Sequence, residues 1–174
     1  FPTRRSSDLA AALLTEADGS PTALAREISL RYDEIMVDEY QDVSPVQEDI
    51  FRAVSRNDGN RFLVGDLKQS IYRFRLADPS IFSDKYERYP LYTEAAGGQA
   101  QKILLRENFR SRREIIDAVN SVFSRCMSRR LGDLDYDEEA ALIFGASYYE
   151  GEVPAPELFL LSAEGDDADE APDR

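Results

Sequence analysis

The sequence predicts an α/β fold, a parallel sheet whose strands are joined by crossover helices. Short apolar runs predict buried strands at residues 32–37, 61–65 and 102–105. Each run is followed by a helix-start signal and an amphipathic stretch. Strands that alternate with helices in this way pair in parallel, so we expect the polar residues that end them to gather at one edge of the sheet.

The helix-start signals lie at three places. Residues 44–47 (SPVQ) combine an N-cap serine, a first-turn proline and a capping-box glutamine. Residues 78–79 (DP) open a second helix. A third helix is expected after the strand at residues 102–105, with Ser111 as its N-cap and Glu114 as the capping-box partner.

The ends of the chain and its junctions differ in composition from the motifs. Residues 10–31 carry alanine and leucine at helical spacing around a turn and predict two short helices. Residues 1–9 (FPTRRSSDL) do not share that pattern, and we expect a foreign remnant or a disordered terminus. Residues 91–101 contain two adjacent glycines and predict a linker. The acidic last ten residues are expected to be disordered.

The formal charge of −13 is unevenly distributed. Residues 131–174 hold 14 acidic residues and one arginine, whereas residues 61–130 hold 14 basic and 8 acidic residues. The average charge argues against a nucleic-acid partner, because binding to phosphate relies on lysine and arginine. The basic surplus of residues 61–130 removes that objection for the part of the chain that carries the motifs.

The single cysteine, Cys126, excludes an internal disulfide, and its place on an apolar helix predicts a buried packing residue. No apolar run is long enough to span a bilayer. We therefore expect a cytoplasmic protein with no membrane partner.

Two carboxylates, Asp38 and Glu39, follow the first predicted strand directly. Nucleotide hydrolysis needs one carboxylate to hold Mg²⁺ and a second to orient or deprotonate the attacking water. Adjacent residues can share this task where the chain leaves the strand, since their side chains no longer alternate between faces. The alternative is a pair of solvated carboxylates at a strand end.

The segment VGDLKQSIYRFR, residues 64–75, follows the second predicted strand. Gln69 offers an amide that can contact both water and a terminal phosphate. Aromatic residues alternate with arginines at its end, and such segments grip single-stranded nucleic acid by base stacking and phosphate contacts. The alternative is that Ile71 and Phe74 belong to the core and the arginines are merely solvated.

The third motif, NFRS at residues 108–111, precedes the third predicted helix. Arg110 would therefore lie near a positive helix terminus, where it could meet phosphate charge as an arginine finger does. Phe109 could stack on a base. The alternative is an ordinary arginine beside an N-cap.

Together these segments resemble consecutive motifs of the superfamily 1 DNA helicases, which contain DExQD, GDxxQSIYxxR and NFRS in this order. The resemblance implies a RecA-like P-loop NTPase motor core, incomplete in this chain, with ATP and Mg²⁺ as cofactors. It implies that Asp38 binds Mg²⁺, that Glu39 is the catalytic base and that Gln69 senses the γ-phosphate.

The same resemblance implies that Phe109 stacks on adenine and that Arg110 contacts the γ-phosphate from the second motor domain. The residues that it implies for DNA binding are Tyr72, Arg73, Phe74 and Arg75. It also implies a division of the chain: residues 10–31 end a helical insertion, residues 32–90 complete the first RecA-like domain, residues 91–101 are a linker, residues 102–130 begin the second RecA-like domain, and residues 131–174 lead into its insertion.

Within the superfamily, the strings GDLKQSIYRFRLADPSIF, LRENFRSRREIID and LDYDEEAALIFGASYY resemble the AddA family, the helicase/nuclease A subunits of AddAB complexes. The resemblance covers about residues 30–160. It implies a parent protein with ATP-dependent helicase and exonuclease activity that acts in double-strand-break repair by recombination. The implied partners are single- and double-stranded DNA and an AddB-like subunit.

Two other functions remain open at this point. One is a repair helicase of the UvrD/PcrA type without a nuclease, which sequence downstream of this chain would distinguish. The other is a non-catalytic DNA-binding or assembly module. That module would bind single-stranded DNA through Arg73, Phe74 and Arg75 even after Glu39 is replaced.

The sequence contains no G-x-x-x-x-G-K-[ST] motif, the loop that wraps nucleotide phosphates. We therefore expect this chain alone to hydrolyse ATP negligibly. A phosphate-release assay with ATP, Mg²⁺ and single-stranded DNA measures this. Substantial DNA-stimulated turnover that disappears in a Glu39→Gln variant would show the expectation to be wrong.

Overall fold

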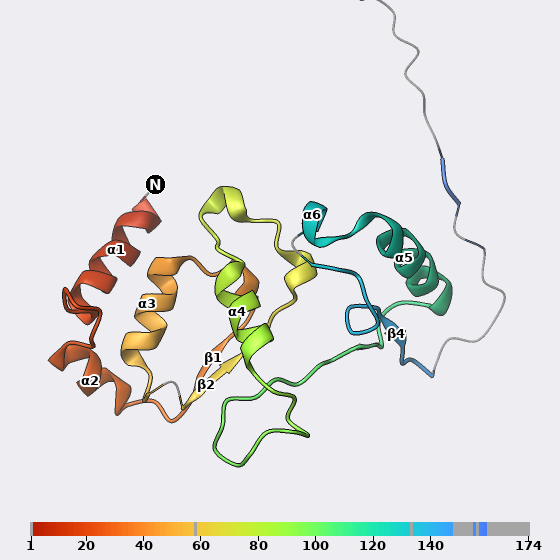
Figure 1. Ribbon diagram of the computed structural model, residues 1–174. Helices are drawn as coiled ribbons and strands as arrows, with labels where there is room; N and C mark the ends of the chain where they lie inside the picture. Colours follow the sequence, from red (N-terminus) through yellow and green to blue (C-terminus); the bar gives the residue numbers. More distant parts are fainter. Residues whose placement is uncertain (1, 58, 133, 148–154, 156, 160–174) are drawn as a thin grey trace, which may run out of the picture. The chain divides into compact units, whose positions relative to one another are not determined.

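The computed structural model describes residues 2–57, 59–132, 134–147, 155 and 157–159. Within these residues the chain forms two compact units (Figure 1). The first unit consists of residues 1–105 together with 128–134, and the second of residues 106–127 together with 135–174. The acidic last ten residues, predicted to be disordered, lie outside the described residues.

Strands and helices alternate in the first unit as the sequence predicts, with short 3₁₀ helices (η) in the loops. The elements are α1 (Pro2–Leu14), α2 (Ala23–Ser29), β1 (Ile35–Val37), η1 (Tyr40–Asp42), α3 (Pro45–Val54), β2 (Arg61–Leu63), η2 (Leu67–Gln69), η3 (Arg73–Arg75), α4 (Ser80–Arg88) and α6 (Arg129–Gly132).

Helices α1 and α2 form the predicted pair around a turn and pack against α3. Leu14, Ala25 and Ala53, one from each helix, are buried in a common core cluster. The hydroxyl of Thr22 caps α2 by accepting a hydrogen bond from the backbone nitrogen of Ala25 at 3.2 Å. Residues 2–9 are helical rather than disordered, because α1 extends from the alanine-rich stretch back to Pro2.

The parallel pairing predicted for the first two strands is confirmed, over three residues in each strand. The paired residues of β1 and β2 are Ile35 with Arg61, Met36 with Phe62, and Val37 with Leu63. Since side chains alternate between the faces of a sheet, Met36 and Phe62 share one face, where they are 70% and 55% exposed. Arg61 points to the other face and contacts Glu48 of α3.

Helix α3 begins as predicted. The Ser44 hydroxyl accepts a hydrogen bond from the Gln47 backbone nitrogen, and the Gln47 side chain accepts one from the Ser44 nitrogen at 2.9 Å. This reciprocal arrangement is a capping box. Helix α4 begins at Ser80, directly after the predicted opening at Asp78 and Pro79.

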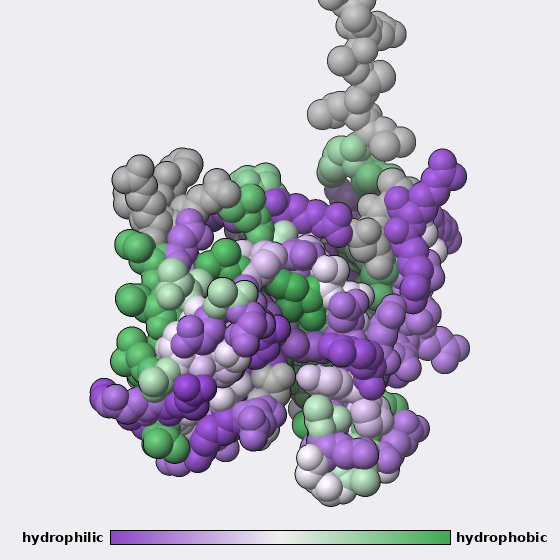
Figure 2. Space-filling view, turned by 60° about the vertical axis from the view of Figure 1, so that its left-hand side comes forward, coloured by the Kyte–Doolittle hydropathy of each residue, from purple (hydrophilic) through white to green (hydrophobic). Residues whose placement is uncertain are grey.

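The surface carries both polar and apolar residues. Figure 2 shows apolar patches (green) among hydrophilic residues (purple). Large apolar side chains exposed on α1 and α2 or just after them are those of Leu9, Leu13, Leu24 and Leu30. Within the described part of the chain, no helix is both long enough and apolar enough to cross a membrane.

The second unit contains β3 (Glu107–Asn108), α5 (Arg113–Cys126) and β4 (Ile143–Phe144), with β3 and β4 paired in parallel. Ile116 of α5 is 2% exposed. Asn120 of α5 donates to the carbonyl oxygen of Leu142 and accepts from the Tyr136 hydroxyl. These bonds hold the segment before β4 against the helix.

The prediction of a strand at residues 102–105 is wrong. Only Lys102 pairs, in an isolated bridge with Leu91, and the strand that does form lies later, at β3. Ile103 and Leu105 are 55% and 83% exposed. An apolar run becomes a strand only where another strand satisfies its backbone groups, and among the described residues this run pairs only through the bridge to Leu91.

The N-cap predicted at Ser111 is also wrong. The side-chain oxygen of Asn108 accepts hydrogen bonds from the backbone nitrogens of Arg110, at 3.0 Å, and Ser111, at 2.8 Å. This local turn uses the nitrogens that would otherwise begin a helix. The N-cap of α5 is therefore one residue later than predicted, at Arg112, whose side chain makes no capping bond, and the helix begins at Arg113.

Cys126 is exposed, so its predicted role as a buried packing residue is wrong. It is the last residue of α5, where the helix ends and its apolar stripe no longer determines burial.

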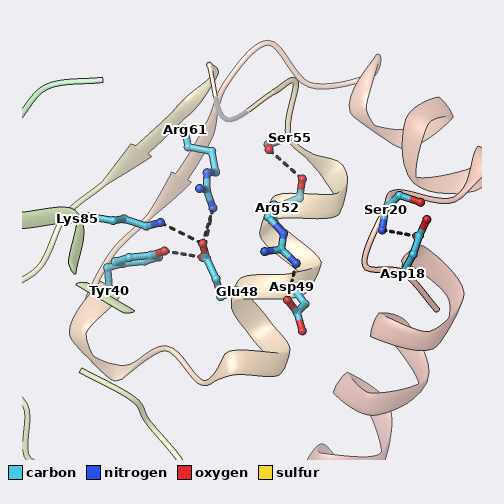
Figure 3. A network of polar contacts seen from close by, with 9 residues as sticks. All are labelled: Asp18, Ser20, Tyr40, Glu48, Asp49, Arg52, Ser55, Arg61 and Lys85. Carbon is cyan, nitrogen blue, oxygen red and sulfur yellow. Dashed lines mark hydrogen bonds and ion pairs between the residues drawn. The ribbon is translucent and has the colours of Figure 1, made fainter. Parts of the chain in front are cut away.

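A buried carboxylate joins four elements of the first unit. Figure 3 shows Glu48 of α3 facing Tyr40 of η1, Arg61 of β2 and Lys85 of α4. The Tyr40 hydroxyl donates to Glu48 at 2.5 Å, and the nearest nitrogens of Arg61 and Lys85 lie at 3.1 Å and 3.2 Å. The side chains of Arg61, Lys85 and Glu48 are 3%, 11% and 13% exposed.

The charges in this cluster are mutually dependent. Burial alone would raise the pKa of Glu48, but the hydrogen bond from Tyr40 and the charges of Arg61 and Lys85 together hold that pKa below its ordinary value. Burial, and then the bond to Glu48, raise the pKa of Tyr40. The cluster therefore contains an ionised glutamate and a neutral tyrosine.

Replacing Glu48 with glutamine (Glu48→Gln) is expected to lower the free energy of unfolding by roughly 3 kcal/mol near neutral pH, because the buried cations lose this carboxylate. The lowered pKa means that the contribution is complete above the ordinary glutamate value of 4.5 and disappears as pH falls below it. Urea unfolding of both chains between about pH 7 and about pH 3 measures the difference.

Asp49→Asn on the same helix is the matched control. Asp49 pairs with Arg52, and the two side chains are 46% and 51% exposed, so its loss should cost less than about 0.5 kcal/mol. Equal losses in the two variants would contradict the special role of Glu48.

Candidate functional site

The ends of β1 and β2 lie side by side, because the two strands are parallel neighbours. The pairing continues one step past the strands: the Val64 nitrogen donates to the Val37 oxygen, and the Tyr40 nitrogen donates to the Val64 oxygen, both at 2.8 Å. The residues that follow each strand, Asp38 and Gly65 onward, therefore emerge at one edge of the sheet, as the sequence predicts.

Asp38 and Glu39 are both exposed at this edge. Glu39 has a φ of 48° and a ψ of 44°, the left-handed conformation that residues with a Cβ seldom adopt. This turn ends the alternation of the strand at the two carboxylates, as the sequence predicts. The side chain of Asp38 accepts a hydrogen bond from the Glu39 nitrogen at 2.9 Å.

Gln41 joins the two strand ends. Its side-chain nitrogen donates to a carboxylate oxygen of Glu39 at 2.7 Å, and its side-chain oxygen accepts from the Asp66 backbone nitrogen at 2.9 Å. Gln41 is 1% exposed. A buried amide with both ends bonded has a fixed orientation.

Gly65 makes the approach of these two turns possible. A Cβ at this position would lie 2.7 Å from the side-chain oxygen of Gln41, 2.8 Å from the ring of Phe82 and 3.2 Å from the Tyr40 nitrogen. No other residue type fits without displacing one of these neighbours. The glycine is therefore required by close packing at this point.

Asp66 organises the turn after β2. Its side chain accepts from the Lys68 backbone nitrogen at 3.0 Å, pairs with the Lys68 ammonium at 2.9 Å and accepts from the Gln69 side-chain nitrogen at 3.1 Å. Burial opposes its ionisation, but the bonds from Lys68 and Gln69 outweigh burial and lower the pKa of Asp66. Gln69 itself is exposed at the end of η2.

The charges of the acidic turn also affect Asp42. Burial, followed by the charge of Glu39, raises the pKa of Asp42. One carboxylate oxygen of Asp42 is buried and has no hydrogen-bond partner. The carboxylates of this turn therefore differ in environment, with Asp38 and Glu39 facing solvent and Asp42 turned inward.

The donors at this edge suit a magnesium ion that is shared with phosphate groups. Mg²⁺ prefers oxygen ligands and is commonly held by one or two carboxylates, with water and substrate phosphates completing its shell. Asp38 supplies an exposed carboxylate of this kind. Among the described residues no three histidine, cysteine, aspartate or glutamate side chains form a cluster that could hold a metal ion.

The aromatic and basic residues after η2 form a compact group, in which Arg73, Phe74 and Arg75 are exposed and Tyr72 is half-buried. The rings of Tyr72 and Phe74 lie 5.8 Å apart, and the Arg75 guanidinium lies 5.0 Å and 5.5 Å from their centres. Phe74 is 76% exposed and Ile71 is 67% exposed. The alternative in which Ile71 and Phe74 are core residues is therefore wrong for this chain.

Residues 6–90, which contain all of the strand-end residues described above, match the UvrD/REP helicase N-terminal domain. Through these residues the chain belongs to the UvrD/REP helicase family. Membership of this family implies a P-loop helicase fold. The described residues contribute two small parallel sheets with helices, which is less than a complete RecA-like core.

Curated relatives of this UvrD/REP chain are named as the A subunits of ATP-dependent helicase/nucleases. The relative from Geobacillus kaustophilus is 48% identical over 145 residues, that from Bacillus velezensis 46% over 167 residues and that from Staphylococcus aureus RF122 41% over 160 residues. These alignments cover 82%, 91% and 90% of the chain but only 11%, 13% and 13% of the relatives. The chain thus spans a small part of the length of the proteins it matches.

Phe109 and Arg110 lie in the second unit, outside the UvrD/REP match. Both are exposed, with Phe109 at 60%, and they follow β3 directly. The turn held by Asn108 fixes the backbone nitrogen of Arg110, and a Cβ on Gly145 would lie 2.7 Å from the Phe109 ring. Within this unit, Asn108 thus fixes the backbone at Arg110, and the ring of Phe109 packs closely against Gly145.

Two residues with a clear structural place, Gln41 and Asp66, were not among the predicted site residues of this UvrD/REP chain. Both lie inside the predicted motifs, as the fourth residue of DEYQD and the second of GDLKQ. The sequence signal that could have identified them is that each is a polar residue in a loop directly after a predicted strand. Their partners, and the burial of Gln41, become visible only once the register of β1 and β2 is known.

Proposed function

We propose that this chain is part of one subunit of an ATP-dependent DNA helicase/nuclease, and that Asp38, Glu39 and Gln69 contribute its ATP hydrolysis site. The observation that carries the proposal is the edge shared by β1 and β2. There, Glu39 and Gln69 are exposed to solvent and joined through Gln41 and Asp66 by hydrogen bonds of 2.7–3.1 Å.

Each exposed group has a chemical role in this proposal. Asp38 would hold Mg²⁺, which supplies charge neutralisation for the phosphates when bound. Glu39 accepts a proton from the attacking water or orients it. Gln69 has an amide with both donor and acceptor capacity, which suits contact with water and a terminal phosphate.

We assign Phe109 and Arg110 to nucleotide binding as well. An exposed ring supports stacking on adenine, and a guanidinium on a turn fixed by Asn108 supports contact with phosphate charge. Family resemblance suggests that these residues act from a second motor domain.

We further assign Tyr72, Arg73, Phe74 and Arg75 to single-stranded DNA binding. The exposed ring of Phe74 and the half-buried ring of Tyr72 offer faces for bases, and Arg75 adds positive charge beside them. Such contacts tolerate any sequence, because every base has a face that can stack.

The similarity to proteins named as helicase/nuclease A subunits supports a nuclease-bearing parent protein over a UvrD/PcrA-type helicase without a nuclease. We propose that the parent acts in double-strand-break repair by recombination, with an AddB-like partner subunit. The non-catalytic module is disfavoured, because the exposed carboxylates and Gln69 at one edge suit hydrolysis.

In the full-length protein, Glu39→Gln is expected to lower DNA-stimulated ATP turnover by roughly 10²- to 10⁴-fold, because it removes the base while leaving the binding groups in place. Phosphate release and fluorescent-nucleotide binding are measured on the same preparation. Turnover that survives the substitution would exclude Glu39 as the base. Absence of turnover before substitution, with DNA binding intact, would favour the non-catalytic module.

Phe74→Ala is expected to weaken single-stranded DNA binding roughly five- to 150-fold, since stacking of one base contributes about 1–3 kcal/mol. Fluorescence anisotropy with a labelled oligonucleotide of mixed sequence measures this. Tyr92→Ala, which removes another exposed ring, is the matched control and should leave the affinity unchanged. Equal effects of the two substitutions would exclude a specific role for Phe74.

A further inference from the structure

We propose that Gln41 and Asp66 are positioning residues that hold Glu39 and Gln69 in a fixed relation for ATP hydrolysis, an inference that rests on the function proposed above. Neither residue need touch the nucleotide in this proposal. Each acts through the exposed side chain that it binds.

The geometry is a continuous series of hydrogen bonds. Glu39 Oε2 accepts from Gln41 Nε2 at 2.7 Å, Gln41 Oε1 accepts from the Asp66 nitrogen at 2.9 Å, and Asp66 Oδ2 accepts from Gln69 Nε2 at 3.1 Å. The series begins after β1 and ends after β2. It therefore links the two strand ends through side chains in addition to the sheet.

Burial along the series explains how it could position its ends. Gln41 in the middle is 1% exposed, whereas Glu39 and Gln69 are exposed. Long exposed side chains populate several rotamers, and each hydrogen bond to a buried, fixed group restricts that freedom. The Gln41 amide cannot rotate by half a turn without losing both bonds, since its nitrogen and oxygen would exchange partners.

Both ends keep chemical capacity after these bonds form. The bond to Gln41 uses one of the two carboxylate oxygens of Glu39. The bond to Asp66 uses one of the two hydrogens on the Gln69 amide nitrogen, which leaves the other hydrogen and the amide oxygen. A positioned group with remaining donors and acceptors can still contact water and phosphate.

The middle of the series is held from several sides. Asp66 is fixed by the ammonium and the backbone nitrogen of Lys68. Gln41 is enclosed by the backbone at Gly65, where a Cβ would approach its oxygen to 2.7 Å. Neither residue can therefore shift without disturbing the turn after β2.

The direct test is Gln41→Glu in the full-length protein, assayed with ATP, Mg²⁺ and single-stranded DNA. Glutamate has nearly the same shape and still accepts from Asp66, but it cannot donate to Glu39 and places a carboxylate against it. We expect kcat to fall at least roughly tenfold while KM for ATP changes less than about threefold. Gln47→Glu is the matched control, because a capping box accepts either residue, and its kcat should equal that of the unmodified protein.

A second arm separates positioning from general stability. In a Glu39→Gln background, Gln41→Glu should lower the residual turnover by less than about twofold, because the group it positions is already absent. A purely structural role predicts the same further loss in both backgrounds. Thermal unfolding of all variants shows whether they are folded at the assay temperature.

Asp66→Asn provides an independent variant if Gln41→Glu does not fold. Its side chain is 31% exposed. Oδ1 accepts from Lys68 and Oδ2 from Gln69, and the change leaves a single acceptor oxygen for the two residues, so we again expect a fall in kcat with KM retained. Normal kcat in a folded positioning variant, combined with an inactive Glu39→Gln protein, overturns this inference alone. Full turnover in Glu39→Gln overturns the proposed function instead.

Discussion

The buried carboxylate of Glu48 is the interaction on which the first unit depends. It accepts from Tyr40 and pairs with Arg61 and Lys85, so that η1, β2, α3 and α4 share one charge centre. Such a group is costly to bury and is tolerated only when its partners are all in place. The four elements are consequently constrained to one arrangement.

That arrangement sets the position of the candidate site. Tyr40 is held by Glu48 through its hydroxyl and by Val64 through its backbone nitrogen, and its immediate neighbours in the chain are Glu39 and Gln41. The backbone next to Glu39 is therefore fixed by the buried cluster around Glu48. The side chains of Asp38, Glu39 and Gln69 are exposed at the edge of the sheet. Preorganised groups of this kind need less rearrangement when a ligand binds.

The sequence was most informative where local signals and packing agree. Helix α3 could be predicted because a serine, a proline and a glutamine at fixed spacing satisfy its first turn, and the parallel pairing followed from strand and helix alternation. The edge with Asp38, Glu39 and Gln69 could be predicted for the same reason, since the carboxyl ends of neighbouring parallel strands coincide.

The short apolar run at residues 102–105 looked equally strand-like, but whether it forms a strand depends on a pairing partner that no local pattern reveals. Likewise, the turn at Asn108 competes with the cap expected at Ser111, and only the folded chain shows which one forms. Gln41 and Asp66 escaped prediction because their importance lies in contacts between strand ends 25 residues apart.

The left-handed backbone at Glu39 determines which residue type selection for stability would favour at this position. Holding a residue with a Cβ at a φ of 48° costs on the order of 1 kcal/mol, a strain that glycine would relieve. Selection for stability alone would thus favour glycine, which carries no carboxylate. Under the role proposed for Glu39, keeping an acid there gives up folding free energy for chemistry, and a stabilising substitution to glycine would remove the catalytic carboxylate.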